Sequence, residues 1–126
     1  MAVTFADTNI VIEYLKGDPF IAEKINGFET VYINDVVIME LFQRAHNKRE
    51  LDFIKKSIMG FDVLTMHQEI VSLARGILDR YTLSHNMKIM DALIAATAMR
   101  YSIPLFTLNT KDFRYLKQIE LVVLPS

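Results

Sequence analysis

The chain contains no cysteine, only four glycines and no long apolar run, and each scarcity excludes a class of protein. Without cysteine there is neither a disulfide nor a thiolate nucleophile, which suits a reducing cytoplasm. The longest uncharged apolar stretch, residues 92–99, is far shorter than the roughly 20 residues that cross a bilayer. The N-terminus lacks the charged and apolar regions of a secretion signal. We therefore expect a cytoplasmic protein without a membrane-spanning segment.

Glycine-rich nucleotide-binding motifs are also missing. Neither the dinucleotide-binding motif GxGxxG nor the P-loop motif GxxxxGK[ST] occurs. We therefore expect that the protein binds neither a dinucleotide through the first motif nor a nucleoside triphosphate through the second. The histidines His46, His67 and His85 show no HExxH or other paired spacing of zinc ligands, and we expect them at the surface or at helix ends. The net charge of −1 at pH 7 disfavours a purely electrostatic nucleic-acid binder, which is normally basic.

What the sequence does have is a regular alternation of apolar runs and amphipathic stretches, which indicates an α/β domain with crossover helices. The expected strands cover residues 3–6, 31–33, 62–64, 103–108 and 121–124. The expected helices cover residues 8–16, 19–27, 35–46, 49–59, 68–81 and 88–101, with a loop at 82–87 and a helical turn at 111–116. The length allows a single domain over residues 1–126, large enough to bury a core without disulfides.

Four carboxylates fall where this alternation would gather them. Asp7 follows the first strand, Glu40 lies in the helix after the second, Asp91 opens an alanine-rich helix, and Asp112 follows the fourth strand. In an open parallel sheet, groups just beyond the carboxyl ends of the strands share one crevice. Acids gathered there repel one another unless cations hold them, and Mg²⁺ and Mn²⁺ prefer oxygen ligands. The pattern predicts a metal site suited to phosphate chemistry, in which a carboxylate could also act as general base.

Structural explanations exist for the same acids. Asp7 could be a capping group like its neighbours Thr8 and Asn9, either of which can cap the next helix. Asp112 alone could be a first-turn acid that the helix dipole favours, with Asn109 in an Asx turn.

Glu40 and Asp91 are harder to explain in this way. A salt bridge for Glu40 and an N-cap role for Asp91 are the structural alternatives. Both residues, however, have almost only apolar neighbours in the sequence, where an unpaired carboxylate is costly. The four acids together therefore favour a functional site.

These segments, in this order and spacing, resemble the PIN domain family of metal-dependent ribonucleases, and most closely its small VapC-type toxins. The matching segments cover nearly the whole chain and are residues 6–9, 13–17, 40–41, 91–98 and the pattern Thr107-x-Asn109-x-x-Asp112-Phe113. By position, the acidic quartet of the family is matched by Asp7, Glu40, Asp91 and Asp112, and its supporting polar residues by Asn9, Thr107 and Asn109. One departure is that many relatives have Ser near Asn34 and Thr near Val37, although Asn34 can still cap the helix.

The resemblance implies a three-layer α/β/α fold with a central, mostly parallel sheet. It also implies an endoribonuclease that hydrolyses RNA phosphodiester bonds with one or two Mg²⁺ or Mn²⁺ ions held by the four acids. Lys111 and Arg114 flank Asp112, and we expect them to contact RNA phosphates.

Two partners are expected. The family implies a cognate small antitoxin protein and a homodimer. The hydrophobic fraction of 52% is high for so small a domain, so surplus apolar surface could be covered by a second subunit or by a partner helix. The candidate residues for such a contact are Phe20, Ile21, Phe42, Phe53, Ile54, Ile58 and Met59. The alternative is that these residues simply belong to the core.

Two other functions deserve comparison. A PIN-like RNA-binding or scaffold protein with little turnover would keep the fold, but here no member of the quartet is missing. An aspartyl-phosphate enzyme of the haloacid dehalogenase type needs a second Asp two residues after the first, where this chain has Asn9. A response-regulator receiver needs an acidic pair near the start that is also absent.

Overall fold

The computed structural model describes residues 2–122, and its strands form one parallel sheet. The strands are β1 (Val3–Ala6), β2 (Thr30–Ile33), β3 (Asp62–Val63) and β4 (Leu105–Phe106), in the order β3-β2-β1-β4. Apart from these strands, Leu121 makes an isolated parallel bridge to Leu105. The first three predicted strands are confirmed within a residue or two. Of the last predicted strand only this bridge is observed, and residues 123–126 lie outside the described part of the chain.

Helices connect the strands. They are α1 (Thr8–Leu15), α2 (Pro19–Asn26), α3 (Asp35–Gln43), α4 (Lys48–Ser57), α5 (Gln68–His85) and α6 (Ile89–Tyr101), with short 3₁₀ turns η1 (Ile58–Gly60) and η2 (Thr110–Asp112). None of these helices is long and apolar enough to span a bilayer within the part of the chain that the structure describes.

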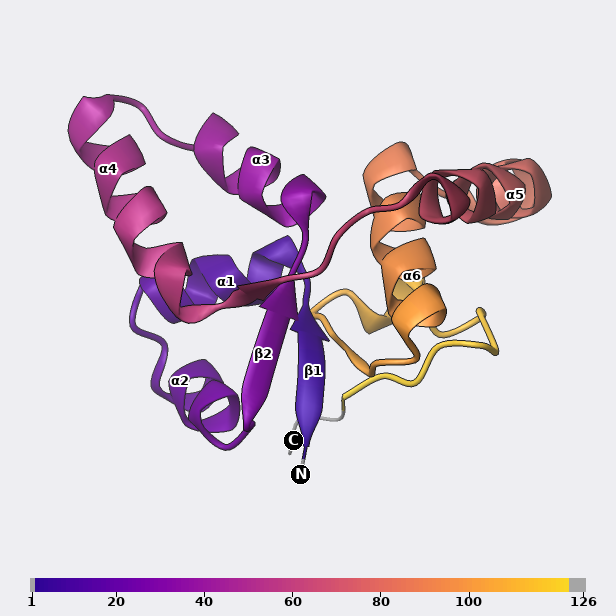
Figure 1. Ribbon diagram of the computed structural model, residues 1–126. Helices are drawn as coiled ribbons and strands as arrows, with labels where there is room; N and C mark the ends of the chain where they lie inside the picture. The colour runs from indigo at the N-terminus through magenta and orange to yellow at the C-terminus, as the bar shows by residue number, and fades with distance from the viewer. Residues whose placement is uncertain (1, 123–126) are drawn as a thin grey trace.

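The three-layer α/β/α arrangement follows from the strand order. The connections from β1 to β2 and from β2 to β3 move across the sheet in one direction, whereas the connection from β3 to β4 returns in the other. Because crossovers between parallel strands are right-handed, α1 to α4 lie on one face and α5 and α6 on the opposite face (Figure 1). The predicted fold class is confirmed.

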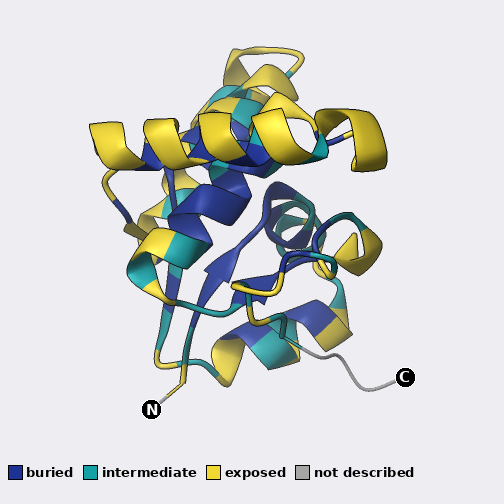
Figure 2. Ribbon diagram, turned by 90° about the vertical axis from the view of Figure 1, so that its right-hand side faces the viewer, coloured by how far each residue is buried: buried dark blue, intermediate teal, exposed yellow. Residues whose placement is uncertain are grey.

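The core lies where the two helical layers meet the sheet. Phe5 and Ala6 of β1 and Phe106 of β4 are fully buried, as expected for strands covered on both faces. On the other side, the small side chains of Ala92 and Ala95 are also fully buried on α6. Helix α5 packs along α6 and turns its outer side to solvent (Figure 2).

Caps define where several helices begin. Asp18 accepts hydrogen bonds from the amides of Phe20 and Ile21 at the start of α2, as predicted, with Pro19 at the first helical position. Asn34, the predicted cap of α3, accepts from the Val37 amide at 3.1 Å.

Other predicted boundaries were wrong. The cap of α1 is Asp7 itself, whose carboxylate accepts from the Thr8 amide, and neither Thr8 nor Asn9. Helix α3 ends at Gln43 rather than near residue 46, and α5 continues through residues 82–85, which were expected to be loop. The fourth strand, expected over 103–108, is only Leu105–Phe106, because the backbone after Phe106 turns to bond the side chains of Asn9 and Thr107.

Candidate active site

A cavity of about 340 Å³ opens at the carboxyl end of β1, close to the point where the crossover helices change faces. In open α/β sheets this is the place where ligands bind. Its lining residues come from α1, α3, α6 and the segments after β1 and β4, and they are Asp7, Thr8, Asn9, Ile12, Glu40, Gln43, Arg44, Asp91 and Asn109. Three of the four predicted acids therefore share one cavity.

Asp7 is almost fully buried and held by several donors. The Thr8 amide donates to Oδ1 at 2.7 Å and the Thr107 hydroxyl to Oδ2 at 2.8 Å, while Asn9 Nδ2 lies 3.4 Å from Oδ2. Burial raises the pKa of Asp7 above its ordinary value although these hydrogen bonds act in the opposite direction, and the charges of Glu40 and Asp112 add to the rise. The residue is thus fixed in position and favours a nearby cation.

Glu40 is half-buried on α3, and its partner is a hydroxyl. Thr8 Oγ1 donates to Glu40 Oε1 at 2.5 Å, which joins the start of α1 to the middle of α3. Within residues 2–122 Glu40 forms no ion pair, since the observed salt bridges join other residues. The salt-bridge explanation for Glu40 therefore fails.

Asp91 is half-buried in the first turn of α6. It is not the N-cap, because that position belongs to Lys88, whose side chain makes no capping bond. Burial raises the pKa of Asp91 to about 6, and the charges of Asp7, Asp112 and Glu40 contribute further. The N-cap explanation for Asp91 is therefore wrong. Its carboxylate is repelled by the charges of the other three acids.

Asp112 ends η2 beside the cavity without lining it. Its charge nevertheless contributes to the raised pKa values of both Asp7 and Asp91. Lys111 and Arg114 are exposed and do not line the cavity either. Among the lining residues the cation is Arg44, one helical turn after Glu40.

The three predicted polar residues form a network around Asp7. Thr107 Oγ1, which donates to Asp7, also accepts from the Asn109 amide at 3.1 Å. Asn9 Oδ1 accepts from the Leu108 amide at 3.1 Å, and Asn9 Nδ2 lies 3.4 Å from Thr107 Oγ1. These bonds tie α1 to the segment after β4 and fix the carboxylate between them.

The donor chemistry of the site suits a hard divalent ion. The acids supply only carboxylate oxygens, which Mg²⁺ and Mn²⁺ prefer, and their mutual repulsion would be relieved by a cation. Among the described residues, however, no group of three His, Cys, Asp or Glu side chains is placed as a ready-made metal site. Binding of one ion by three of the acids would require their side chains to draw together.

Thr8, Gln43 and Arg44 were missed as site residues from the sequence. Gln43 and Arg44 stand three and four positions after Glu40, which places them on the same side of α3. That spacing was the available signal. Nothing local in the sequence showed that Thr8 would bond a carboxylate 32 positions away.

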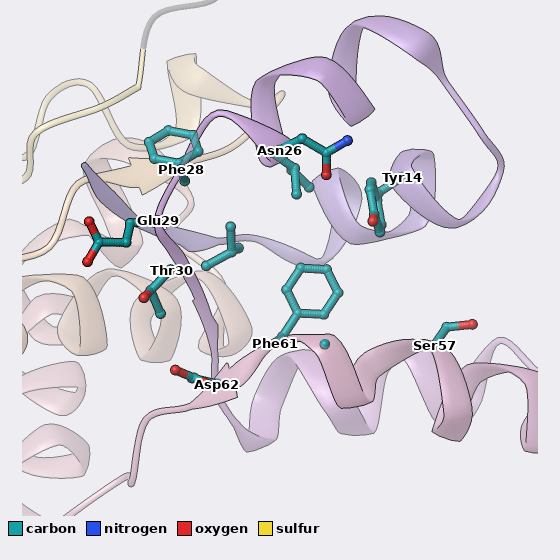
Figure 3. A pocket seen from close by; sticks show the side chains of 11 residues that line it. Tyr14, Asn26, Phe28, Glu29, Thr30, Ser57, Phe61 and Asp62 are labelled. Carbon is teal, nitrogen blue, oxygen red and sulfur yellow. The ribbon is translucent and has the colours of Figure 1, made fainter. Parts of the chain in front are cut away.

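A second cavity of about 300 Å³ is lined by none of the four predicted acids (Figure 3). It opens at the amino end of β2 and beside β3, with Phe28, Glu29, Phe61 and Asp62 among its lining residues. Its walls contain none of the predicted site residues.

Comparison with known proteins agrees with this geometry. The sequence profile described as PIN domain matches residues 4–118. The chain belongs to the PIN domain family. A curated relative, Ribonuclease VapC of Rickettsia bellii, is 34% identical over 128 aligned positions, which cover 94% of each chain. Ribonuclease VapC2 of Methanocaldococcus jannaschii is 29% identical and covers 94% of this PIN domain and 91% of its own length.

Solved structures share the fold. The DNA-bound VapBC structure from Salmonella typhimurium contains a chain that matches with a TM-score of 0.81 at 23% identity, covering 97% of this PIN domain and 98% of that chain. A chain of VapBC2 from Rickettsia felis, bound to a promoter DNA fragment, matches with a TM-score of 0.79 at 18% identity, covering 95% and 97% of the two chains.

Proposed function

We propose that this PIN domain is a Mg²⁺- or Mn²⁺-dependent endoribonuclease, and that it is the toxin of a type II toxin–antitoxin pair acting in the cytoplasm. The observation that carries the proposal is the single cavity shared by Asp7, Glu40 and Asp91, in a chain whose curated relatives are named ribonucleases. Carboxylates gathered at one point suit metal-assisted hydrolysis of a phosphodiester.

Asp7, Asp91 and Asp112 would hold the metal, with Glu40 as a ligand directly or through water. The bound ion would activate water and neutralise charge on the scissile phosphate. The remaining residues hold the carboxylates in place: Thr107 and Asn9 orient Asp7, and Thr8 orients Glu40.

RNA phosphates would be contacted by cations near the acids. Arg44 is the first candidate because it lines the cavity that contains Asp7 and Glu40. Its planar guanidinium can bond a phosphate through two N–H groups. Lys111 and Arg114 remain candidates for phosphates farther along the strand, since they flank Asp112 and are exposed.

The partner antitoxin would bind along an apolar groove between α1, α3 and α4. This groove of about 260 Å³ shares Ile12 and Arg44 with the acidic cavity. Leu15, Leu41, Phe53 and Ile54 contribute much of its apolar lining. An amphipathic helix bound there could continue into the acidic cavity with a basic side chain, which would block RNA. Complexes of related fold described as VapBC or as toxin–antitoxin complexes support a protein partner.

A homodimer is part of the proposal. Of the seven apolar residues predicted to form a contact surface, Phe20, Phe53 and Met59 are exposed. Ile21 and Ile54 are buried in the core, which was the alternative for these residues, and Ile54 also lines the groove proposed for the antitoxin. Phe42 and Ile58 are partly buried against the core.

Cleavage of a labelled unpaired RNA tests the enzymatic part. We expect cleavage with Mg²⁺ or Mn²⁺ and none in EDTA, with activity restored when metal is added back. Cleavage that persists in EDTA would exclude a metal-dependent site, and binding without any cleavage in either metal would favour the PIN-like scaffold. Co-expression with the product of the adjacent reading frame tests the partner, which should co-purify and inhibit.

A further inference from the structure

Three aromatic side chains form a cluster where α5 ends, and we call Tyr81, His85 and Tyr115 the aromatic platform. The imidazole of His85 stacks on the Tyr115 ring, with centroids 3.8 Å apart and an interplanar angle of 15°. Tyr81 lies 5.0 Å from Tyr115 and 5.6 Å from His85, tilted by 60° and 75°. The stacked pair is thus braced by a third ring.

One face of the His85 ring is covered by neither of the other two rings. A ring covering the outer face of His85 would lie roughly twice the stacking distance from Tyr115, or about 7–8 Å. Tyr81 is only 5.0 Å from Tyr115, so it stands beside the stacked pair and does not cover that outer face. His85 is exposed, whereas Tyr115 is partly buried and packs against the core. The platform therefore offers a flat ring surface to solvent on a rigid support.

Short segments of the chain connect the platform to two of the acids. Tyr115 follows Asp112 by three positions, and its hydroxyl lies 3.8 Å from the sulfur of Met87, in the short segment that leads to Asp91. Burial raises the pKa of the Tyr115 hydroxyl above its ordinary value, and the charges of Asp112 and Asp91 raise it further.

Cations border the same surface. The guanidinium of Arg80 lies 5.5 Å from the centre of the Tyr81 ring, and exposed Arg114 is adjacent to Tyr115 in the chain. Aromatic rings beside cations are the combination that binds single-stranded nucleic acid, since the rings stack bases and the cations bind phosphates.

We propose that the aromatic platform stacks an unpaired nucleobase of an RNA strand bound at the acidic cavity, with the open face of His85 as the contact. The inference rests on the proposed ribonuclease function and adds to it a binding position for a base. Stacking on an exposed ring accepts any base and binds purines more strongly, because a larger ring covers more surface. His85 would act as a positioning residue for the strand.

If the stacking of His85 on Tyr115 had only a structural role, a different result would be expected. If His85 only fastens the segment around Tyr115 to α5, its replacement would change stability and would not distinguish RNA that has bases from RNA that lacks them. The bases of the ligand therefore provide the readout that separates the two roles.

The test is fluorescence anisotropy with Ca²⁺ in place of Mg²⁺, since Ca²⁺ also takes oxygen ligands, and with three labelled 12-nucleotide probes: oligoadenylate, oligouridylate and an abasic ribose-phosphate strand of equal charge. We expect His85→Ala to weaken oligoadenylate binding about tenfold, oligouridylate binding less, and abasic binding not at all. His85→Phe should retain the preference for adenine. His67→Ala, at the exposed N-terminal end of the same helix, is the matched control and should bind like wild type.

Several results would overturn the inference. They are equal binding of oligoadenylate by wild type and His85→Ala, an equal loss for the abasic strand, or loss of the adenine preference in His85→Phe. If His85→Ala does not fold, the wild-type chain still decides by NMR: the His85 ring protons should move upfield with oligoadenylate and not with the abasic strand. Metal-dependent cleavage without base-dependent binding would reject the stacking proposal and leave the proposed function intact. The absence of both RNA binding and cleavage would reject the proposed function as well.

Discussion

Asp91→Asn is expected to stabilise the fold at neutral pH when no divalent metal is present. The pKa of Asp91 rises from its ordinary 3.8 to about 6 on folding, first through burial and then through the charges of Asp7, Asp112 and Glu40. At 1.36 kcal/mol per pKa unit, this difference corresponds to an upper limit of about 3 kcal/mol. The side chain is only half-buried, so solvent screening reduces the expected effect to about 1–2 kcal/mol.

The effect of Asp91→Asn on stability should depend on pH in a defined direction. Well below pH 3.8 the carboxyl is protonated in both the folded and the unfolded chain, so Asp91 and its Asn replacement should be equivalent. As the pH rises from about 4 through 6, the folded chain must ionise a carboxyl that prefers to stay neutral, and stability is lost. The stability difference between Asp91→Asn and wild type should therefore be small at pH 4 and reach its full size by pH 7.

Urea unfolding followed by far-UV circular dichroism, in EDTA at pH 4 to 7, measures this difference. At pH 7 the variant should also melt about 4–8 °C higher than wild type. Asp79→Asn, which removes an exposed acid of α5 outside the cavity, is the control and should not show the same rise. An Asp91→Asn variant that is less stable than wild type at pH 7, or equally displaced at pH 4 and pH 7, would refute the reasoning.

Other perturbations test other parts of the site. Thr8→Val removes the hydrogen bond to Glu40 and should lower kcat about tenfold. It should also lower the melting temperature, because a hydrogen bond to a charged group contributes about 1.5–3 kcal/mol to stability. Thr8→Ser should keep most activity, and equal rates in Thr8→Val and wild type would exclude the positioning role. Arg44→Ala should weaken RNA binding and reduce the slope of log K against log salt by about one. The double replacement of Lys111 and Arg114 by Ala should reduce this slope further if both residues contact phosphates. An unchanged slope would show that the replaced residues are solvated and do not contact RNA. Light scattering should give the mass of a dimer at micromolar concentration, and a monomer there would reject the homodimer. Phe53→Ser should prevent co-purification with the antitoxin, because Phe53 lines the proposed groove, and an intact complex would place the antitoxin elsewhere.

The parts of the fold that could be predicted from the sequence are those determined locally. The alternation of apolar runs was sufficient for the parallel sheet, and Asp18-Pro19 and Asn34 marked helix starts because capping depends on neighbouring amides. Asp7 could be placed because it directly follows β1, and residues that follow parallel strands meet at one edge of the sheet. Glu40 and Asp91 lie on helices, and Asp112 does not line the cavity.

Long-range contacts explain what could not be predicted. The last turn of α5 was expected to be loop because its apolar periodicity stops at Tyr81, but stacking of His85 on Tyr115 supports that turn from another part of the chain. Likewise, the amide nitrogen of Asn34 donates to the Thr97 hydroxyl at 2.9 Å, across 63 positions. The sequence showed that Asn34 could cap a helix, but not that it would also join α3 to α6.

The central claim is that the acids around Asp7 bind a divalent ion that RNA cleavage requires. Titration of Mn²⁺ followed by electron paramagnetic resonance, with the cleavage rate measured in the same samples, tests it most directly. For wild type, binding and cleavage should rise together with Mn²⁺ concentration, whereas folded Asp7→Asn and Asp91→Asn should bind the ion weakly and cleave at background rate. Either variant cleaving RNA at the wild-type rate, or wild-type cleavage without Mn²⁺ binding, would contradict the account.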